Sequence, residues 1–297
     1  VLPTYILFHI RYSQKVQRNM KIVYFGNDLF SNCLLLLIKN RLNIERVFIN
    51  DVQENASFIK RICRKYNIVY STEKPSIVTL KGYLNDEQTV FVVADYGYKV
   101  PTNEIKYAIN IHPSLLPKSR GPTPLTYIID NPENAGVSIH KLTEKLDAGS
   151  ILIQEKFEVE NNETISSLMV KSQLLAETLL EELLNNFNEL YNNATPQLEK
   201  LASFQSLPPV KRRFVNWDQN TAQFSHALRQ YGHFGILISL DNALYIANDV
   251  EVTTFSHDFT CGSIIFEDAL IKSIAINDGY VVLSKRSLRL YESRVLN

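Results

Sequence analysis

The pattern of hydrophobic and polar positions from residue 20 onward alternates between two periods. Short apolar runs predict strands, and the run TVFVVA at 89–94 is apolar on both faces, as in a parallel strand covered on both sides. Longer stretches with apolar residues every three or four positions predict helices. In chain order, this part has predicted strands at 22–25, 46–49, 89–94, 107–111, 136–140 and 151–157, and predicted helices at 30–40, 56–66 and 164–187. Such alternation predicts an α/β fold with a Rossmann-like, twisted and mostly parallel sheet.

The pattern changes beyond about residue 202, where Leu207, Pro208 and Pro209 interrupt the chain. One helix is predicted at 221–231. It is followed by short β-like runs at 235–240, 243–247, 262–266, 270–276 and 280–283. The last two are joined by Asn277, Asp278 and Gly279, a strong hairpin signal. We therefore expect an α/β domain over 20–200 and a smaller β-rich domain, a barrel or sandwich, over 205–297.

Residues 1–19 do not fit either pattern. Their apolar patch at 5–10 precedes Arg11, Lys15 and Arg18, whereas a secretory signal has its basic region first. We interpret this segment as a disordered extension or a mis-assigned start before Met20. No apolar run approaches the roughly 20 residues that a membrane-spanning helix needs, so no membrane partner is expected.

Composition narrows the function classes. The 297 residues carry 31 Lys+Arg and 31 Asp+Glu, and this balance argues against a general nucleic-acid binder, which needs surplus positive charge. The three cysteines lie far apart, which excludes a disulfide framework or zinc finger and indicates a reducing, cytoplasmic location. No metal is expected. Gly26 follows a strand, but no second or third glycine completes a dinucleotide-binding motif.

The chemistry is concentrated where the strand at 107–111 ends. Asn110 and His112 are two positions apart, so in a strand they share a face. An amide can donate to a developing oxyanion and an imidazole can move a proton near neutral pH, which suits an acyl-transfer site. Asp147 follows about one strand–helix–strand unit later and could return to the same sheet edge. In isolation, His112 also fits a structural role and Asp147 fits a loop cap.

Four blocks of sequence together resemble the folate-dependent formyltransferases. They are MKIVYFG at 20–26, ADYGYKVP at 94–101, NIHPSLLPKSRG at 110–121, and GVSIH at 136–140 with LDAG at 146–149. The resemblance covers about 20–190 and continues faintly through 214–217. It implies the formyltransferase fold, with 20–200 as the catalytic domain and an OB-like C-terminal domain.

The resemblance also implies a reaction, in which a primary amine takes the formyl group of the cosubstrate N10-formyltetrahydrofolate. Asn110 would hold the carbonyl oxygen, His112 would take the amine proton, and Asp147 would orient His112. The cosubstrate is expected to contact the loop after the central strand and two later loops. The residues concerned are Ala94, Tyr96, Gly97, Val100, Leu115, Leu116, Pro117 and Gly149.

The family offers several acceptors, and charge separates them. Methionyl-tRNA formyltransferases typically carry a basic, Gly-rich insertion after the second strand, but here that connection is short and holds Asp51 and Glu54. From residue 201 onward there are nine Lys/Arg and nine Asp/Glu. A nucleotide-linked amino sugar is therefore favoured, with tRNA as the alternative. Glycinamide ribonucleotide transformylases lack a C-terminal β domain.

Two further classes stay open. A formyltetrahydrofolate hydrolase would share Asn110, His112 and Asp147 but typically adds a regulatory domain, and a non-catalytic folate- or sugar-binding module would not use them. The cluster Lys211, Arg212 and Arg213 is interpreted as a solvated linker, with phosphate binding as its alternative. Edge strands at 235–240 and 243–247 make a homodimer a candidate assembly.

Overall fold

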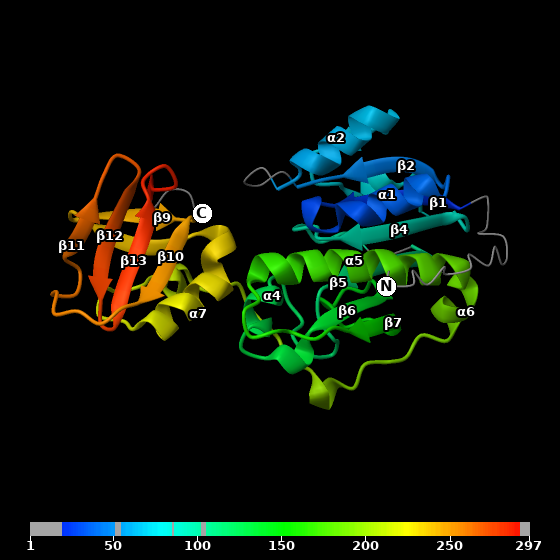
Figure 1. The fold of residues 1–297 in the computed structure, drawn as a ribbon. Helices are drawn as coiled ribbons and strands as arrows, with labels where there is room; N and C mark the ends of the chain where they lie inside the picture. Colours follow the sequence, from blue (N-terminus) through cyan, green and yellow to red (C-terminus); the bar gives the residue numbers. More distant parts are fainter. Residues whose placement is uncertain (1–19, 51–54, 85, 102–104, 292–297) are drawn as a thin grey trace, which may run out of the picture.

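The computed structural model describes residues 20–50, 55–84, 86–101 and 105–291, and its first part is built on one seven-stranded sheet (Figure 1). The strand order is β3-β2-β1-β4-β5-β6-β7. The first five strands in this order, from β3 through β5, pair in parallel, while β6 and β7 join the sheet antiparallel. The bounds are β1 (Lys21–Gly26), β2 (Asn43–Phe48), β3 (Tyr70–Ser71), β4 (Thr89–Ala94), β5 (Tyr107–His112), β6 (Gly136–Lys141) and β7 (Ile151–Lys156). The prediction of a mostly parallel α/β sheet is confirmed.

The central strand β4 is buried at all six positions, as its uniform apolar pattern predicts. Val90 and Val92 belong to the larger core cluster, which lies on the face covered by α1 and α5. Phe91 and Val93 belong to a second cluster on the opposite face, together with Leu80 of α3. Both faces of the sheet are therefore covered.

The α-helices of this part are α1 (Ser31–Lys39), α2 (Ser57–Tyr66), α3 (Ile77–Leu80), α4 (Leu125–Ile128), α5 (Ile165–Asn185) and α6 (Phe187–Asn192). Helices α1, α2 and α5 lie at predicted positions, whereas the short helices α3, α4 and α6 were not predicted. Thr164 and Ser167 form a capping box that fixes the start of α5. The predicted helix 164–187 ends two residues early, because Asn186 leaves helical geometry and α6 begins at Phe187. Among the described residues, no helix is long and apolar enough to cross a membrane.

The return from β5 to β6 differs from the expected strand–helix–strand unit. The only α-helix between the two strands is the single turn α4, and β6 runs antiparallel to β5, with Asn110 directly opposite His140. The connection between β2 and α2 consists of residues 49–56. Asp51 and Glu54, on which the prediction of an acidic connection depends, lie outside the described residues, as do residues 1–19.

The C-terminal region contains two antiparallel sheets, of order β10-β13-β12-β11 and β14-β9-β8, which confirms its β-rich prediction. Phe224 of α7, Ile238 of β8 and Ile274 of β12 share one buried cluster, so both sheets and the helix pack on a common core. The elements are α7 (Thr221–Tyr231), β8 (Ile236–Leu240), β9 (Ala243–Ala247), β10 (Val250–Thr254), β11 (Ile264–Glu267), β12 (Ile271–Ile276), β13 (Gly279–Ser284) and β14 (Arg289–Leu290).

One of the two expected pairing edges is wrong. Strand β9 lies between β14 and β8, so its backbone is already paired on both sides. Strand β8 is at the edge of its sheet, although Leu237 makes an isolated bridge with Phe214. Strand β14 pairs only through Arg289 and Leu290, and a two-residue strand is too short to be evident from alternation in the sequence.

Helix α7 joins the C-terminal region to the first part of the chain. The Gln230 amide nitrogen donates to Thr126 O of α4 at 2.8 Å and to Asp130. Arg229 Nε donates to Glu163 O, also at 2.8 Å. Because Gln230 is buried and its polar atoms are satisfied, this contact is a packed junction rather than a loose tether.

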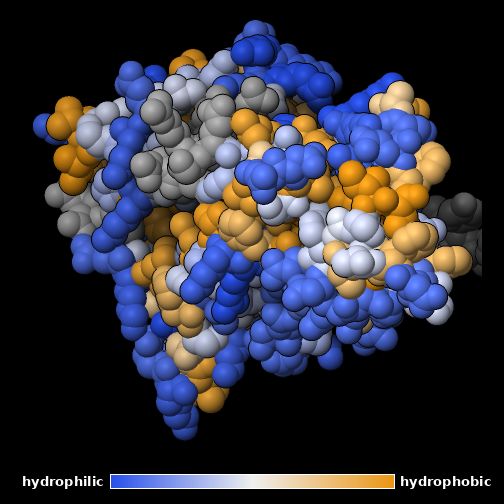
Figure 2. All heavy atoms as spheres, turned by 90° about the vertical axis from the view of Figure 1, so that its left-hand side faces the viewer, coloured by the Kyte–Doolittle hydropathy of each residue, from blue (hydrophilic) through white to orange (hydrophobic). Residues whose placement is uncertain are grey.

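The C-terminal region also exposes large apolar side chains. Phe255, Phe259 and Phe266 are each more than half exposed. Figure 2, which views the molecule from the side of this region, shows hydrophobic residues interspersed with hydrophilic ones. Scattered exposed apolar side chains of this kind are normal on protein surfaces.

Two leucines of α5 test the packing of this helix on the sheet. Leu180 is fully buried in the larger core cluster, whereas Leu174 on the same helix is 56% exposed. We expect Leu180→Ala to lower the free energy of unfolding by about 2–5 kcal/mol, because it removes buried methyl groups and leaves a cavity. The control Leu174→Ala should change it by less than about 0.5 kcal/mol. Urea unfolding measures both, and equal effects would contradict the described orientation of α5.

Candidate active site

The predicted chemical residues lie at the carboxyl ends of the parallel strands. Strand β1 pairs with β2 on one side and with β4 on the other, so the strand order reverses there, and ligands in α/β sheets bind beside such a reversal. Asn110 and His112 lie at the end of β5, next to β4. Asp147 lies in the loop that connects β6 to β7. The structure brings the three side chains together.

The Asn110 amide is held by two acceptors. His140 Nδ1 lies 2.8 Å from Lys141 O, and a carbonyl can only accept, so Nδ1 carries a proton. Asn110 Nδ2 donates to His140 Nε2 at 3.0 Å and to Asp147 Oδ1 at 3.2 Å. Both amide hydrogens therefore have partners within the chain, and the contact with Asp147 is the longer of the two.

The buried His112 ring has a defined tautomer. Its Nε2 donates to Ser119 O at 2.9 Å, so its Nδ1 holds the lone pair, and this atom faces Asp147 Oδ2 at 3.7 Å. Burial lowers the pKa of the imidazole, and the attraction of Asp147 and the bond to Ser119 offset only part of that effect. His112 is therefore neutral at pH 7, with a proton-accepting nitrogen directed at a carboxylate.

Asp147 is a buried carboxylate with several compensating contacts. Gly121 N donates to its Oδ2 at 2.8 Å, and His140 Nε2 lies 3.6 Å from its Oδ1. Burial raises the pKa of this carboxyl, but the neighbouring imidazoles and the Gly121 N–H outweigh burial and hold the pKa at about 2. The group is thus ionised at neutral pH. A proton arriving on His112 Nδ1 would be stabilised by this fixed negative charge.

Two glycines allow the loops around Asp147 to approach each other. A Cβ on Gly149 would lie 1.8 Å from Lys141 O, and a Cβ on Gly121 would lie 2.1 Å from Gln205 O. Gly121 also has φ +117°, a conformation that disfavours other residues. Glycine is therefore required at both positions for the carboxylate to sit where it does.

Sequence reasoning missed two side chains that contact this site. His140 lies opposite Asn110 across the antiparallel β5–β6 pair, and the sequence does not reveal the register that places it there. Gln197 donates to Asp147 O and Gly149 O from a segment about fifty residues downstream. Arg120, part of the motif that carries the resemblance, is buried and directed at Gln197 and Glu199. These contacts indicate a structural role for Arg120.

The predicted cosubstrate residues after β4 form a loop beside the site. Gly97 N donates to Asn50 Oδ1, and a Cβ on Gly97 would lie 2.4 Å from the Asn50 amide nitrogen. Ala94 and Val100 are buried, so only their backbone could meet a ligand. Tyr96 packs on Phe25, and its buried hydroxyl has no partner within the described residues. An unsatisfied hydroxyl beside an open loop fits a polar heterocycle such as a pterin.

The remaining predicted contacts are mostly structural. Leu116 is buried, and Leu115 packs over Gly136. Pro117 follows a cis peptide bond, and its carbonyl accepts from Ser203 N. Gly149 O is taken by Gln197. Their proposed role in cosubstrate binding stays a prediction.

The basic cluster of the linker splits into two kinds of residue. Arg213 Nε donates to Gly235 O at 2.8 Å, and its guanidinium also binds Phe234 O, so it fixes the start of β8. Arg212 lies over the Tyr127 ring, 5.7 Å from its centroid. Lys211 is exposed. The prediction of a wholly solvated linker is therefore wrong for Arg213, which is structural.

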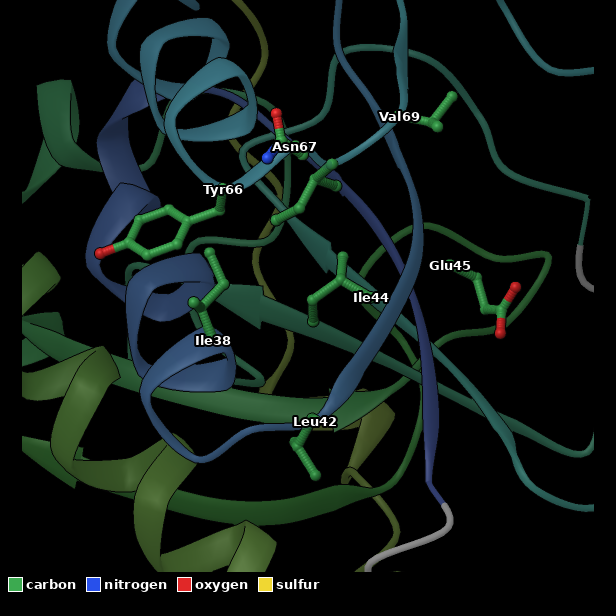
Figure 3. Close-up of a pocket in the computed structure, with 8 residues that line it drawn as sticks. Ile38, Leu42, Ile44, Glu45, Tyr66, Asn67 and Val69 are labelled. Atoms are coloured by element: carbon green, nitrogen blue, oxygen red, sulfur yellow. The ribbon is translucent and has the colours of Figure 1, made fainter.

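A separate open pocket lies at the opposite end of the sheet (Figure 3). It is lined where α1 and α2 end and β2 begins, by Ile38, Leu42, Ile44, Glu45, Tyr66, Asn67, Ile68 and Val69. The amino end of β2 is distant from the carboxyl ends that carry the candidate site. This pocket contains no residue of the Asn110–His112–Asp147 set. The described part of the chain also holds no group of three or more His, Cys, Asp or Glu that could bind a metal ion.

The fold is a doubly wound α/β sheet, and its site brings an amide, an imidazole and a carboxylate together. Residues 53–184 match the model of the formyl transferase family. The methionyl-tRNA formyltransferase of Staphylococcus aureus (strain MW2) is 29% identical over 235 residues, which are 76% of each chain. These matches support a folate-dependent formyltransferase family and indicate a formyl-transferring enzyme.

Solved structures support the same fold. WlaRD, described as a sugar 3N-formyl transferase with dTDP and 5-N-formyl-THF, matches with a TM-score of 0.60 at 20% identity, over 89% of this chain and 97% of its own. HypX from Aquifex aeolicus in complex with tetrahydrofolic acid matches with a TM-score of 0.63 at 17% identity, over 94% of this chain and 47% of its own. At these identities the matches establish the fold alone.

The electrostatics of the His112–Asp147 pair can be measured directly. We expect the His112 pKa to lie below its ordinary 6.5, and Asp147→Asn to lower it further, because the carboxylate attracts the charged ring. NMR titration of the ¹³C-labelled histidines measures both. As a control, Asp130→Asn, which changes a carboxyl outside the site, should leave the His112 titration unchanged. A His112 pKa at or above 6.5, or one raised in Asp147→Asn, would contradict the described geometry.

Proposed function

We propose that the protein transfers the formyl group of N10-formyltetrahydrofolate to a primary amine. The observation that carries this proposal is the neutral, buried His112 ring, whose free Nδ1 faces the ionised Asp147 beside the Asn110 amide. Bound formyltetrahydrofolate would supply an activated formyl group. The structures of WlaRD with 5-N-formyl-THF and of HypX with tetrahydrofolic acid support the cosubstrate class.

Each residue of the set has a role in this reaction. His112 Nδ1 takes the proton that the amine loses as it attacks the formyl carbon, and Asp147 stabilises the imidazolium that results. Asn110 donates to the formyl oxygen as negative charge develops there. For this it uses the hydrogen that now lies on the longer contact, with Asp147 Oδ1. Proton return from His112 to N10 of the departing tetrahydrofolate completes the exchange.

Residues of the loop after β4 would hold the cosubstrate. The unpartnered Tyr96 hydroxyl and the backbone from Ala94 to Val100 offer polar contacts. This loop follows β4, and β4 lies next to β5, which carries Asn110 and His112. A folate bound there would present its formyl group toward the end of β5.

The acceptor that we favour is a nucleotide-linked amino sugar. Residues 201–297 have equal numbers of acidic and basic side chains, whereas a surface for tRNA is usually basic. A small acceptor needs only a local pocket for its base and phosphates. The Helicobacter canadensis N-formyltransferase, which matches with a TM-score of 0.60, was solved in complex with dTDP-3-aminofucose, and this supports the class.

The second candidate acceptor is methionyl-tRNA. Relatives with this name align with 76% of the chain, and α2 exposes Arg61, Arg64 and Lys65 close to the connection where tRNA enzymes carry their basic insertion. A panel assay separates the candidates. The protein is mixed with formyltetrahydrofolate and either nucleotide-linked amino sugars or Met-tRNA, and the formylated product is identified. Formylation of Met-tRNA alone would exclude the favoured acceptor, and formate release without any amine would indicate a hydrolase.

Substitutions in the site test the reaction itself. His112→Ala and Asp147→Ala should each lower kcat by about 10²- to 10⁴-fold, since they remove the proton acceptor and its counter-charge. Asn110→Ala should lower kcat by about 10²- to 10³-fold. His226→Ala, which replaces a half-exposed histidine of α7, serves as the control and should keep its activity. Folding of every variant is checked by circular dichroism. Near-normal turnover by a folded His112→Ala would exclude the proposed mechanism.

The pH dependence has a defined sign. Only the neutral form of His112 can accept a proton, so kcat should fall as the pH drops through the His112 pKa. Burial places that pKa below 6.5, so the decline should begin on the acidic side of 6.5. The measurement is kcat from pH 5 to 8 at saturating substrates. A decline centred above 6.5 would show that another group controls the proton transfer.

A further inference from the structure

The segment from Thr195 to Gln205 bonds to both loops of the candidate site, the loop after β5 and the loop between β6 and β7. At one end, Thr195 exchanges two backbone hydrogen bonds with Ile151 at 2.8 Å. At the other end, Arg120 N donates to Ser203 O, and Gln205 N donates back to Arg120 O. The segment thereby ties the loop that ends β5 to the start of β7. Its central polar side chain is Gln197.

Gln197 uses its whole carboxamide to join the two loops. Its Oε1 accepts from Arg120 Nη2 at 2.8 Å and from Arg120 Nε at 3.1 Å. Its Nε2 donates to Asp147 O at 2.8 Å and to Gly149 O at 2.7 Å. Each of its donors and lone pairs therefore has a partner, which defines one orientation of the amide. A side chain satisfied in this way is a rigid link rather than a solvated surface group.

The bond from Gln197 to Asp147 O is made at a residue with an unfavourable backbone conformation. Asp147 has φ +51°, in the left-handed region that non-glycine residues rarely adopt. The conformation directs the carboxylate toward His112 and the Gly121 N–H. Gln197 Nε2 donates to two carbonyls in this turn, Asp147 O and Gly149 O. Without these two bonds, the loop would lose the restraints that the downstream segment supplies.

We propose that Gln197 is a positioning residue for formyl transfer, which holds the Asp147 carboxylate at its working distance from His112. This inference rests on the proposed function, because it assigns Gln197 to the same reaction. Gln197 acts through Asp147 and does not itself touch the reacting atoms. Glu199 also bridges the two loops, because it accepts from Arg120 and from Lys145, but it is exposed and bonds to neither the Asp147 nor the Gly149 carbonyl. Of the two bridges, the Gln197 amide is therefore the one that holds the Asp147 turn directly.

Two substitutions distinguish the role of the Gln197 carboxamide oxygen from that of its nitrogen. Gln197→Met keeps the length of the side chain and removes all four bonds. Gln197→Glu keeps acceptors for Arg120 and removes the donors to Asp147 O and Gly149 O. Both variants should lower kcat by about 10- to 100-fold, because a small displacement of a catalytic group has this cost. The KM values should stay within about twofold, since the binding surfaces are unchanged. Lys200→Met, an exposed change in the same segment, is the matched control.

The ionisation of His112 supplies a readout that a merely structural role would not move. Asp147 and His140 are the ionisable neighbours that influence His112, and of these Asp147 raises its pKa. Displacement of Asp147 should therefore shift the acidic decline of kcat, and the NMR titration of His112, to lower pH in both Gln197 variants. Unfolding midpoints of the same variants show whether the fold survives.

The outcomes separate failure of this inference from failure of the proposed function. Wild-type protein that transfers no formyl group to any amine would overturn the proposed function, while the NMR titration of His112 would still test the positioning. An active wild type with unchanged kcat and unchanged His112 titration in folded Gln197→Met would overturn the inference. Loss of activity in Gln197→Met but not in Gln197→Glu would also overturn it, because the effect would then arise from Arg120.

Discussion

The geometry of the site depends on a single buried charge, the Asp147 carboxylate. An ionised carboxyl that is only about 6% exposed is stable only if the chain surrounds it with donors. Gly121 N and the Asn110 amide donate to it, and two imidazoles lie within 4 Å of its oxygens. These groups come from β5, from β6 and from the loop after β5. Satisfying one charge therefore brings together the strands and loops on which catalysis depends.

The sheet could be predicted because six of its seven strands carry a local signal. The uniform burial of β4 appears directly in TVFVVA, and α7 was predicted at its observed bounds. Elements with no such signal were missed: β3 and β14 have two residues each, and β10 is mostly polar and exposed. The sequence also does not predict which strands pair with each other. Strand β9 was taken for an edge because its hydrophobic pattern does not say that β14 returns beside it.

The same distinction explains which parts of the site the sequence revealed. Asn110 and His112 share a face through the period of a single strand, so their proximity is a local property. Asp147 was placed beside them by the order of motifs that resemble a family, and the structure brings it within 3.7 Å of His112. His140 and Gln197 contact the set through strand register and through a downstream segment. His140 ends the GVSIH block, but nothing in that block says that it faces Asn110, and Gln197 has no signal at all, because both contacts join distant parts of the chain.

The choice of acceptor depends on how many positive charges are available to bind phosphate. A count of charges does not show how many of them already have partners within the chain. In the C-terminal region, Arg213 and Arg229 bind backbone carbonyls, while Lys272 and Lys285 pair with Glu267. These side chains already have partners within the chain and contribute less to attracting phosphate than free ones would. A tRNA acceptor stem presents many phosphates, and its binding needs many available cations. Exposed residues such as Lys211 would suffice for the two phosphates of a nucleotide sugar but not for an extended helix. The distribution of charge therefore favours a small acceptor more strongly than the neutral total does.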